Sequence, residues 1–145
     1  MTQVSVTETI EAPADAVWNT VRGFGNMDKV LPEMVAKCEV TGSGAGATRL
    51  CTFHDGMKLN ERLESVDEAG CAITYSIEDN VMPFNGYLST VRVRDAGGGK
   101  TEVNWSSTFS LNGITEAEAT GMLEGVYRTG IGQLQRINAQ TPAEK

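Results

Sequence analysis

The stretch TEAEATGMLEGVYRTGIGQLQRINA, residues 115–139, is the longest helix-forming segment of this 145-residue chain. Thr115 and Glu118 have the spacing of a capping box, which starts a helix. At about 100° per residue, one side of the predicted helix carries Leu123, Tyr127, Gly130, Ile131 and Leu134. A helix with one apolar side needs a second layer of structure to cover that side.

The segment before this helix is typical of a β-sheet. Short runs rich in Val, Ile, Thr, Tyr and Phe alternate with breaks that contain Gly, Asp or Asn. They predict strands at Val35–Thr41, Ala47–His54, Lys58–Asp67, Ala72–Glu78, Asn85–Asp95 and Lys100–Leu111. Alternating polar and apolar residues predict a first strand over Thr2–Glu11. Pro13 and an apolar stripe at Val17 and Val21 predict a helix that follows it, and a helical turn over Asn26–Leu31 ends before Pro32.

Consecutive strands joined by short loops favour an antiparallel meander. We therefore expect an α+β fold with a seven-stranded curved antiparallel sheet wrapped around the long C-terminal helix, and two short helices between strands 1 and 2. The only element long enough to cover one face of such a sheet is that helix. We expect residues 1–139 to form a single domain, followed by a flexible tail at residues 140–145.

Composition excludes several classes of partner. The chain has 19 acidic and 12 basic residues, a formal net charge of −7, and no run of three bases, which argues against nucleic acids and anionic membranes. No run of about 18 apolar residues could span a bilayer. We expect a cytoplasmic protein without membrane insertion, either a monomer or a weak homodimer.

The residues that most often hold metals are sparse. Cys38, Cys51 and Cys71 are widely spaced, which fits neither a disulfide framework nor a zinc site, and we expect three buried reduced thiols. His54 is the only histidine. We therefore expect no metal site and no cofactor.

The chain resembles a known superfamily in a series of short motifs spread from about Val4 to Ile137. They are Glu11-Ala12-Pro13-Ala14-Asp15-Ala16-Val17-Trp18, Leu31-Pro32, Gly46-Ala47-Thr48-Arg49, Glu61-Arg62-Leu63, Tyr87, Val103-Asn104-Trp105, and Tyr127 with Gly130-Ile131 and Leu134. Together they are similar to the START/birch-pollen-allergen superfamily, and within it to the bacterial polyketide cyclase/dehydrase-like (SRPBCC) group. The resemblance implies a helix-grip fold with a ligand cavity between the sheet and the C-terminal helix.

Three functions are compatible with this resemblance. The first is binding of an apolar small molecule that is lipid-, polyketide- or isoprenoid-like. The second is a polyketide cyclase or dehydratase that uses the same cavity, in which Arg49 polarises a carbonyl, Glu61 moves protons and Tyr87 donates. The third is a protein-interaction module that uses the glycine side of the last helix, at Gly121, Gly125 and Gly132. Fold alone does not choose among them.

Glu61 interrupts an otherwise apolar strand face, between Leu59 and Leu63. A bulge or an irregular register would turn Glu61 to water. The resemblance implies the opposite, because plant-hormone receptors of this superfamily place the glutamate of a Glu-Arg-Leu element in the pocket. Arg49 is the candidate partner if its strand faces inward, whereas a two-residue hairpin at Asp55-Gly56 would favour Leu50 inward.

Further side chains are predicted to line the cavity. With the residues above, the full candidate set is Arg49, Cys51, Phe53, Leu59, Glu61, Leu63, Tyr75, Ile77, Phe84, Tyr87, Ser89, Trp105, Leu123, Tyr127, Gly130 and Ile131. For Tyr75 and Tyr87, ordinary core packing is an equal alternative. On the last strand, alternation favours Trp105 inward, whereas alignment to the hormone receptors favours Asn104 and Ser106.

Two loops correspond to those that gate the pocket in related receptors. They are His54-Asp55-Gly56 and Asn80–Phe84, and the second could place Met82, Pro83 and Phe84 across the mouth as a lid. His54 suits a general base by its ordinary pKa, although a solvated surface role is the more usual one at such a position. The lysine that anchors a carboxylate ligand in those receptors aligns with Ala36 here, which argues against hormone-like recognition.

Overall fold

A seven-stranded antiparallel sheet forms the body of the protein, in the order β1-β7-β6-β5-β4-β3-β2. The computed structural model describes residues 1–78 and 82–139. The strands are β1 (Thr2–Ile10), β2 (Val35–Thr41), β3 (Thr48–Phe53), β4 (Lys58–Asp67), β5 (Ala72–Ile77), β6 (Phe84–Gly97) and β7 (Lys100–Leu111). The helices are α1 (Ala14–Arg22), α2 (Met27–Val30) and α3 (Glu116–Asn138). The predicted fold class and order of elements are confirmed, and most predicted boundaries lie within two residues of the observed ones.

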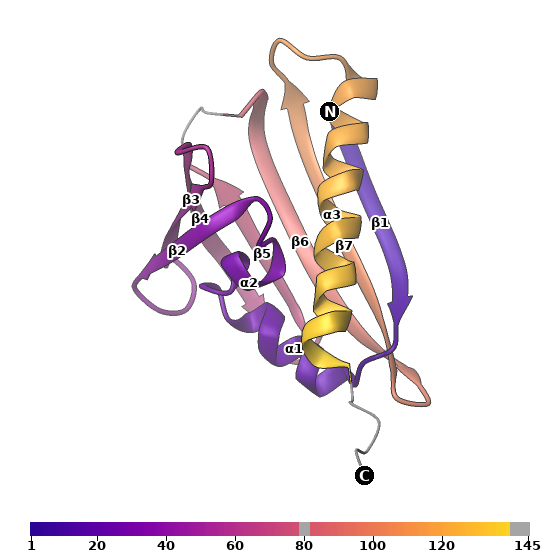
Figure 1. Cartoon of the computed structure of the whole chain (residues 1–145). Helices are drawn as coiled ribbons and strands as arrows, with labels where there is room; N and C mark the ends of the chain where they lie inside the picture. Colours follow the sequence, from indigo (N-terminus) through magenta and orange to yellow (C-terminus); the bar gives the residue numbers. More distant parts are fainter. Residues whose placement is uncertain (79–81, 140–145) are drawn as a thin grey trace.

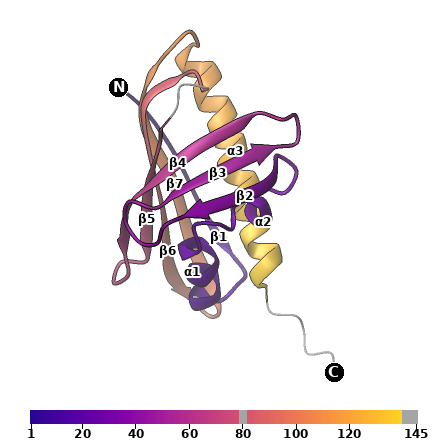
Figure 2. The ribbon, with the colours of Figure 1, turned by 90° about the vertical axis from the view of Figure 1, so that its left-hand side faces the viewer.

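The sheet curves around α3, which crosses it lengthwise, while α1 and α2 lie beside the helix (Figures 1 and 2). The predicted capping box is present, because Thr115 Oγ1 accepts from the Glu118 amide and the Glu118 carboxylate accepts from the Thr115 amide. The apolar side of α3 is buried as expected at Leu123, Tyr127, Ile131 and Leu134. Burial of each such side chain contributes about 1.5–3 kcal/mol, so α3 is held mainly by its contact with the sheet.

The turn between β3 and β4 decides which side chains of β3 point inward. The alternative with a two-residue hairpin is wrong, because the Phe53 N–H bonds Met57 O and the turn encloses three residues, His54, Asp55 and Gly56. Gly56 adopts a φ of +92°, which closes this loop. The extra residue shifts the register by one, so Arg49 rather than Leu50 lies opposite Glu61.

Strand β4 does contain an irregularity, but it lies beyond Glu61. The register between β4 and β5 shifts between Leu63 and Ser65, whereas Glu61 still pairs with Ile77 in the regular part of the ladder. The alternation at Leu59, Glu61 and Leu63 therefore persists, and all three side chains are buried. The alternative in which a bulge turns Glu61 to water is wrong.

Candidate functional site

A cavity of about 310 Å³ lies between the curved sheet and α3. The strands β2 to β7 supply half of its lining residues, α2 and the segment after it close one side, and α3 closes another. Its lining residues are Met27, Leu31, Met34, Val35, Cys51, Phe53, Met57, Leu59, Glu61, Tyr75, Ile77, Met82, Tyr87, Trp105, Met122, Leu123, Val126 and Tyr127. Glu61 is the only charged side chain among the described residues of this wall.

Glu61 is held by a buried ion pair. Arg49 Nε lies 2.7 Å from Glu61 Oε1, and the two residues are 2% and 6% exposed. Arg49 Nη1 also donates to the Phe24 carbonyl at 2.9 Å. The guanidinium stacks against the rings of Phe24 and Tyr75, at 4.1 and 4.7 Å from their centroids. Burial alone would lower the pKa of Arg49, but the adjacent Glu61 carboxylate raises it overall, so the Arg49 guanidinium stays charged.

Arg49 stands behind Glu61 and is not among the residues that line the 310 Å³ cavity. It contacts instead a smaller space of about 30 Å³ between β3, α1 and α2. Of the three catalytic candidates, Glu61 and Tyr87 thus face the larger cavity and Arg49 does not. The geometry gives Arg49 the role of holding the Glu61 carboxylate in place.

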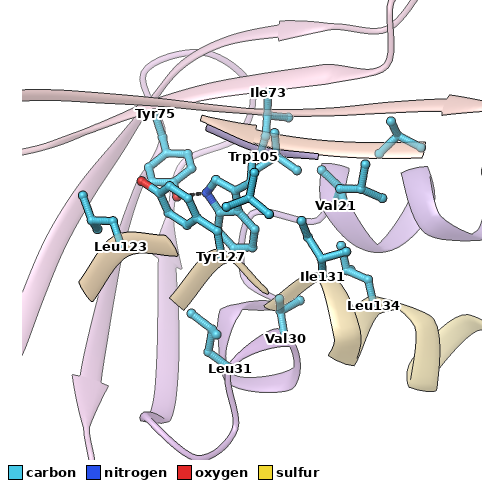
Figure 3. Packing of buried hydrophobic residues seen from close by; sticks show 14 of the residues in the cluster. Val21, Val30, Leu31, Ile73, Tyr75, Trp105, Leu123, Tyr127, Ile131 and Leu134 are labelled. Atoms are coloured by element: carbon cyan, nitrogen blue, oxygen red, sulfur yellow. Dashed lines mark hydrogen bonds between the residues drawn. The ribbon is translucent and has the colours of Figure 1, made fainter. Parts of the chain in front are cut away.

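Aromatic side chains form a hydrogen-bonded layer at the cavity wall. Trp105 Nε1 donates to the Tyr75 hydroxyl and to Ser89 Oγ, each at 3.1 Å. Its indole stacks on the Tyr127 ring (Figure 3), and the two ring centroids are 5.1 Å apart. The inward orientation of Trp105 predicted by alternation is therefore confirmed. Asn104 lies on the other face of β7, where it donates to Ser5 Oγ and Thr7 Oγ1 of β1.

Two of the tyrosine hydroxyls are joined directly. Tyr127 donates to Ser107 Oγ at 2.7 Å, and because a phenol has one proton, Tyr87 is the donor in its hydrogen bond to Tyr127. Burial raises the pKa of both tyrosines. The pKa of Tyr75 is also raised, mainly by burial and to a lesser extent by the nearby Glu61 carboxylate. All three phenols are therefore neutral at pH 7 and offer polar contacts without charge.

Five of the predicted lining residues besides Arg49 lie outside the wall of the 310 Å³ cavity. Leu63 faces a surface depression under Gly42, Ser43 and Gly44. Phe84 packs against the rings of Tyr87 and Phe109. The Ser89 hydroxyl accepts a hydrogen bond from Trp105 Nε1 and donates one to the Ser106 carbonyl. Ile131 is fully buried in the core.

Gly130 is the fifth of these residues. A Cβ at this position would lie 2.5 Å from Trp105 Cζ3. The glycine therefore admits the indole against α3 and leaves no room for a ligand there. The observed role of Gly130 is therefore to let the sheet approach α3 closely.

The sequence interpretation missed four of the five methionines of the cavity wall and gave the fifth, Met82, only as part of a lid. Met27, Met34, Met57, Met82 and Met122 all line the cavity, and they are all the methionines of the chain except Met1. Four of them lie in loops or in the short helix α2, where no strand or long-helix period marks them, and Met122 lies on α3 directly before Leu123. The available signal was chemical, because methionine is enriched at surfaces that adapt to different apolar partners.

The cavity adjoins a groove at the protein surface. Leu31, Met34, Met122 and Val126 line both the cavity and a depression that also includes Glu33, Gly125 and Thr129. The four shared residues come from α3 and from the segment that joins α2 to β2. Part of the second predicted gate, Asn80 and Val81, lies outside the described residues, as does the predicted tail at 140–145. Met82 does line the cavity.

His54 occupies the other predicted gate and makes a structural contact. Its Nε2 lies 2.8 Å from the Pro32 carbonyl, so this nitrogen carries the proton and donates. The His54 amide also bonds the Met34 carbonyl at 3.2 Å. These contacts tie the β3–β4 loop to the segment after α2, and the His54 side chain is not part of the cavity wall.

The three cysteines are free thiols with different surroundings. Cys51 is buried, whereas Cys38 and Cys71 are half-buried, so the expectation of three buried thiols is wrong for two of them. Cys38 and Cys51 lie directly opposite each other on β2 and β3. Within residues 1–78 and 82–139, no group of three or more His, Cys, Asp or Glu side chains could hold a metal ion. None of the three helices described is long and apolar enough to cross a bilayer.

Comparisons with known proteins agree with this fold. The model of a family described as polyketide cyclase / dehydrase and lipid transport matches residues 1–137. The chain is 27% identical to the abscisic acid receptor PYL2 of Arabidopsis thaliana over 140 residues, which cover 89% of this chain and 73% of the receptor. The solved structure of the protein XoxI from Bacillus cereus is 28% identical, with a TM-score of 0.86 over 95% of this chain and 96% of that one.

A more distant structure shares the fold alone. Norcoclaurine synthase from Thalictrum flavum, solved with dopamine and hydroxybenzaldehyde, is 17% identical with a TM-score of 0.74. The match covers 93% of this chain and 84% of the synthase.

Proposed function

Because the chain belongs to the polyketide cyclase / dehydrase and lipid transport family, we propose that it binds an apolar small molecule in the cavity between the sheet and α3. The ligand is lipid-, polyketide- or isoprenoid-like. The observation that carries the proposal is a cavity whose wall is apolar apart from one carboxylate and a few neutral polar groups. Ligand pockets typically combine such a wall with a few polar groups that orient the ligand.

The size of the cavity narrows the ligand class. At about 310 Å³ it lies at the small end of the range for small-molecule pockets, roughly 300–1,000 Å³. This favours a compact molecule, such as a fused-ring polyketide or a short isoprenoid, over a whole phospholipid. The five methionines allow some adjustment, because their unbranched side chains change rotamer at little cost.

The polar groups specify how such a ligand would lie. Arg49 fixes the Glu61 carboxylate through a hydrogen bond, and Glu61 can accept a second one from a ligand hydroxyl. The neutral hydroxyls of Tyr75 and Tyr87 lie on neighbouring strands of the same wall. We therefore expect a ligand with an apolar body and a hydroxyl or similar donor directed at Glu61, rather than an anion, which Glu61 would repel.

Binding is tested first with N-phenylnaphthylamine, a neutral apolar fluorescent probe. Its emission should rise on addition of the protein, and an isoprenoid alcohol and an aromatic polyketide should displace it. The variant Leu59→Trp places an indole in the cavity and should weaken probe binding at least tenfold. Its matched control is Leu88→Trp, which adds the same indole at a side chain that is 42% exposed on β6.

The variant and its control separate cavity binding from adsorption to the surface. Equal binding by wild type, Leu59→Trp and Leu88→Trp would place the probe elsewhere and reject the cavity as the site. Absence of probe binding, together with no apolar molecule released on denaturing the purified protein, would reject the binding function.

Catalysis in the same cavity is a second candidate. It is favoured by the position of a fixed carboxylate, Glu61, near the Tyr75 and Tyr87 hydroxyls, because cyclisation or dehydration needs a group that moves a proton and a donor to an oxygen. If a polyketide substrate is turned over, Glu61→Gln and Tyr87→Phe should lower kcat at least a hundredfold and tenfold respectively. Unchanged kcat in both folded variants would remove this mechanism.

A further inference from the structure

Cys38 and Cys51 form a close pair on the two strands at one edge of the sheet. Their Sγ atoms are 2.9 Å apart, and the residues are direct partners in the antiparallel register of β2 and β3. Directly opposite residues in such a ladder have Cα atoms about 4.5–5.5 Å apart, within the range of about 4.4–6.8 Å that a disulfide requires. The two sulfur atoms would have to move only about 0.9 Å closer together to reach the disulfide bond length of about 2.05 Å.

The two thiols differ in their exposure and in the direction of their pKa shifts. Cys38 is half-buried and Cys51 is buried, so an oxidant from solvent meets Cys38 first. The hydrogen bond from Cys51 lowers the pKa of Cys38, and the charge of Arg49 acts in the same direction. The same contact and burial raise the pKa of Cys51. Oxidation-sensitive cysteines are typically accessible, of low pKa and adjacent to a second thiol that resolves the first product.

We propose that Cys38 and Cys51 are an oxidation site at which hydroperoxides produce a cross-strand disulfide. The Cys38 thiolate attacks the terminal peroxide oxygen, the O–O bond breaks, and a sulfenic acid forms on Cys38 while the departing alkoxide takes up a proton. The Cys51 sulfur then attacks the Cys38 sulfur. The S–O bond breaks, and hydroxide leaves as water with the proton of Cys51. In total, two thiols and one hydroperoxide give one disulfide, one alcohol and one water.

The disulfide would join the edge strand β2 to its neighbour β3. β2 is an edge strand, bonded to the rest of the sheet only through β3 (Figure 2). Covalent attachment at Cys38 ties this edge to β3 and closes a short loop of chain, which restricts the unfolded state. Oxidation should therefore raise the melting temperature by about 5–10 °C. Since Cys51 also lines the cavity, the cross-link lies in the wall of the proposed binding site, but its formation does not depend on that function.

The experiment treats the full-length reduced protein with a small excess of hydrogen peroxide. The intact mass should fall by two hydrogen atoms. Trypsin without reductant should release residues 38–49 linked to residues 50–58, because Lys37, Arg49 and Lys58 flank these peptides. The variant Cys38→Ser should lose the cross-link and the rise in melting temperature. The control Cys71→Ser removes the third thiol and should keep both.

Each outcome decides the proposal. A cross-link between residues 38–49 and 50–58 that survives Cys71→Ser and disappears in Cys38→Ser supports it. Cross-links that involve Cys71, oxidation that stops at sulfinic acid on Cys38, or full retention of free thiols would overturn it. Cys38 is half-buried, so its serine variant should fold, and circular dichroism checks this; Cys38→Ala serves as a second variant.

Discussion

Replacement of Arg49 by methionine tests whether the buried ion pair holds the cavity carboxylate. The substitution keeps a long apolar side chain against Phe24 and Tyr75 but removes the charge 2.7 Å from Glu61. A carboxylate that is only 6% exposed then has no counter-charge. We expect a large loss of stability, because the penalty for a buried charge exceeds that for the lost contact.

The structure allows the size of this loss to be worked out. Removal of one partner from a buried ion pair costs about 3–5 kcal/mol. Two further groups of Arg49 change this cost in opposite directions. The bond from Arg49 Nη1 to Phe24 O is lost as well, whereas the buried Nη2, which has no hydrogen-bond partner in the part of the chain described, no longer needs one. We therefore expect Arg49→Met to lower the free energy of unfolding by about 3 kcal/mol.

Removal of both charges provides the matched comparison. The double variant Arg49→Met/Glu61→Leu leaves no buried charge, and apolar replacement of a whole buried pair is often neutral or better. Its free energy of unfolding should lie within about 1 kcal/mol of wild type. The double variant should also bind the neutral probe at least as tightly as wild type, because its cavity wall is more apolar.

Equilibrium urea unfolding followed by circular dichroism measures these differences. With a slope of about 2 kcal/mol per molar urea, Arg49→Met should lower the midpoint by about 1.5 M. A loss below about 1 kcal/mol in Arg49→Met would show that Glu61 does not depend on Arg49. A double variant no more stable than the single one would refute the explanation by charge.

Three further predictions follow from other contacts. Gly130→Ala should destabilise the protein by about 1–2 kcal/mol, because its Cβ would lie 2.5 Å from Trp105. On the exposed side of α3, the Cβ of Gly132→Ala meets nothing within 4 Å, so this variant should stabilise the protein by about 0.5–1 kcal/mol. Thermal unfolding compares the two variants, and equal changes in stability would contradict the packing argument. Thr115→Ala should lower the free energy of unfolding by about 1 kcal/mol at neutral pH. Hydrogen bonds from Thr115 lower the pKa of Glu118, so the stabilisation by this carboxylate is present above its ordinary pKa of 4.5 and is lost as the pH falls through the lowered value. Urea unfolding at neutral and at acid pH should show a smaller loss of stability in acid, and an equal loss at the two pH values would contradict this prediction. Burial raises the pKa of all three tyrosines, so their contribution to the stability of the fold is complete below the ordinary tyrosine pKa of about 10 and is lost at higher pH. Phenolate absorbance should therefore appear only as the protein unfolds in alkali. Gradual ionisation of the tyrosines with unchanged circular dichroism would contradict this prediction.

Residue periodicity was sufficient to predict the fold. Strand alternation placed Val4, Val6 and Trp105 inward, and helical spacing placed Leu123 and Tyr127 on the buried side of α3. These inferences succeed because burial of apolar surface dominates folding, and because side chains repeat every 2 residues in a strand and about every 3.6 in a helix. The order of the elements also followed from these patterns, and the resemblance to helix-grip proteins added the expectation of a ligand cavity between the sheet and α3, in a family whose model matches residues 1–137.

The candidate site depended on contacts that no local pattern encodes. Whether Arg49 or Leu50 faced Glu61 was settled by one additional residue in the turn at His54-Asp55-Gly56. The pairing of Cys38 with Cys51 depends on the register of β2 against β3. A strand's sequence specifies which residues share a face, but not how far that strand slides along its neighbour.

The sequence by itself determined the sheet, the long helix and the presence of one acidic residue on an apolar face. Only the tertiary structure decided that Arg49 stands behind Glu61, that Gly130 admits Trp105, and that five methionines from separate segments line one cavity. The physical reason is that secondary structure follows from side-chain period along the chain. A cavity is instead formed by residues distant in sequence, whose positions depend on how the layers pack.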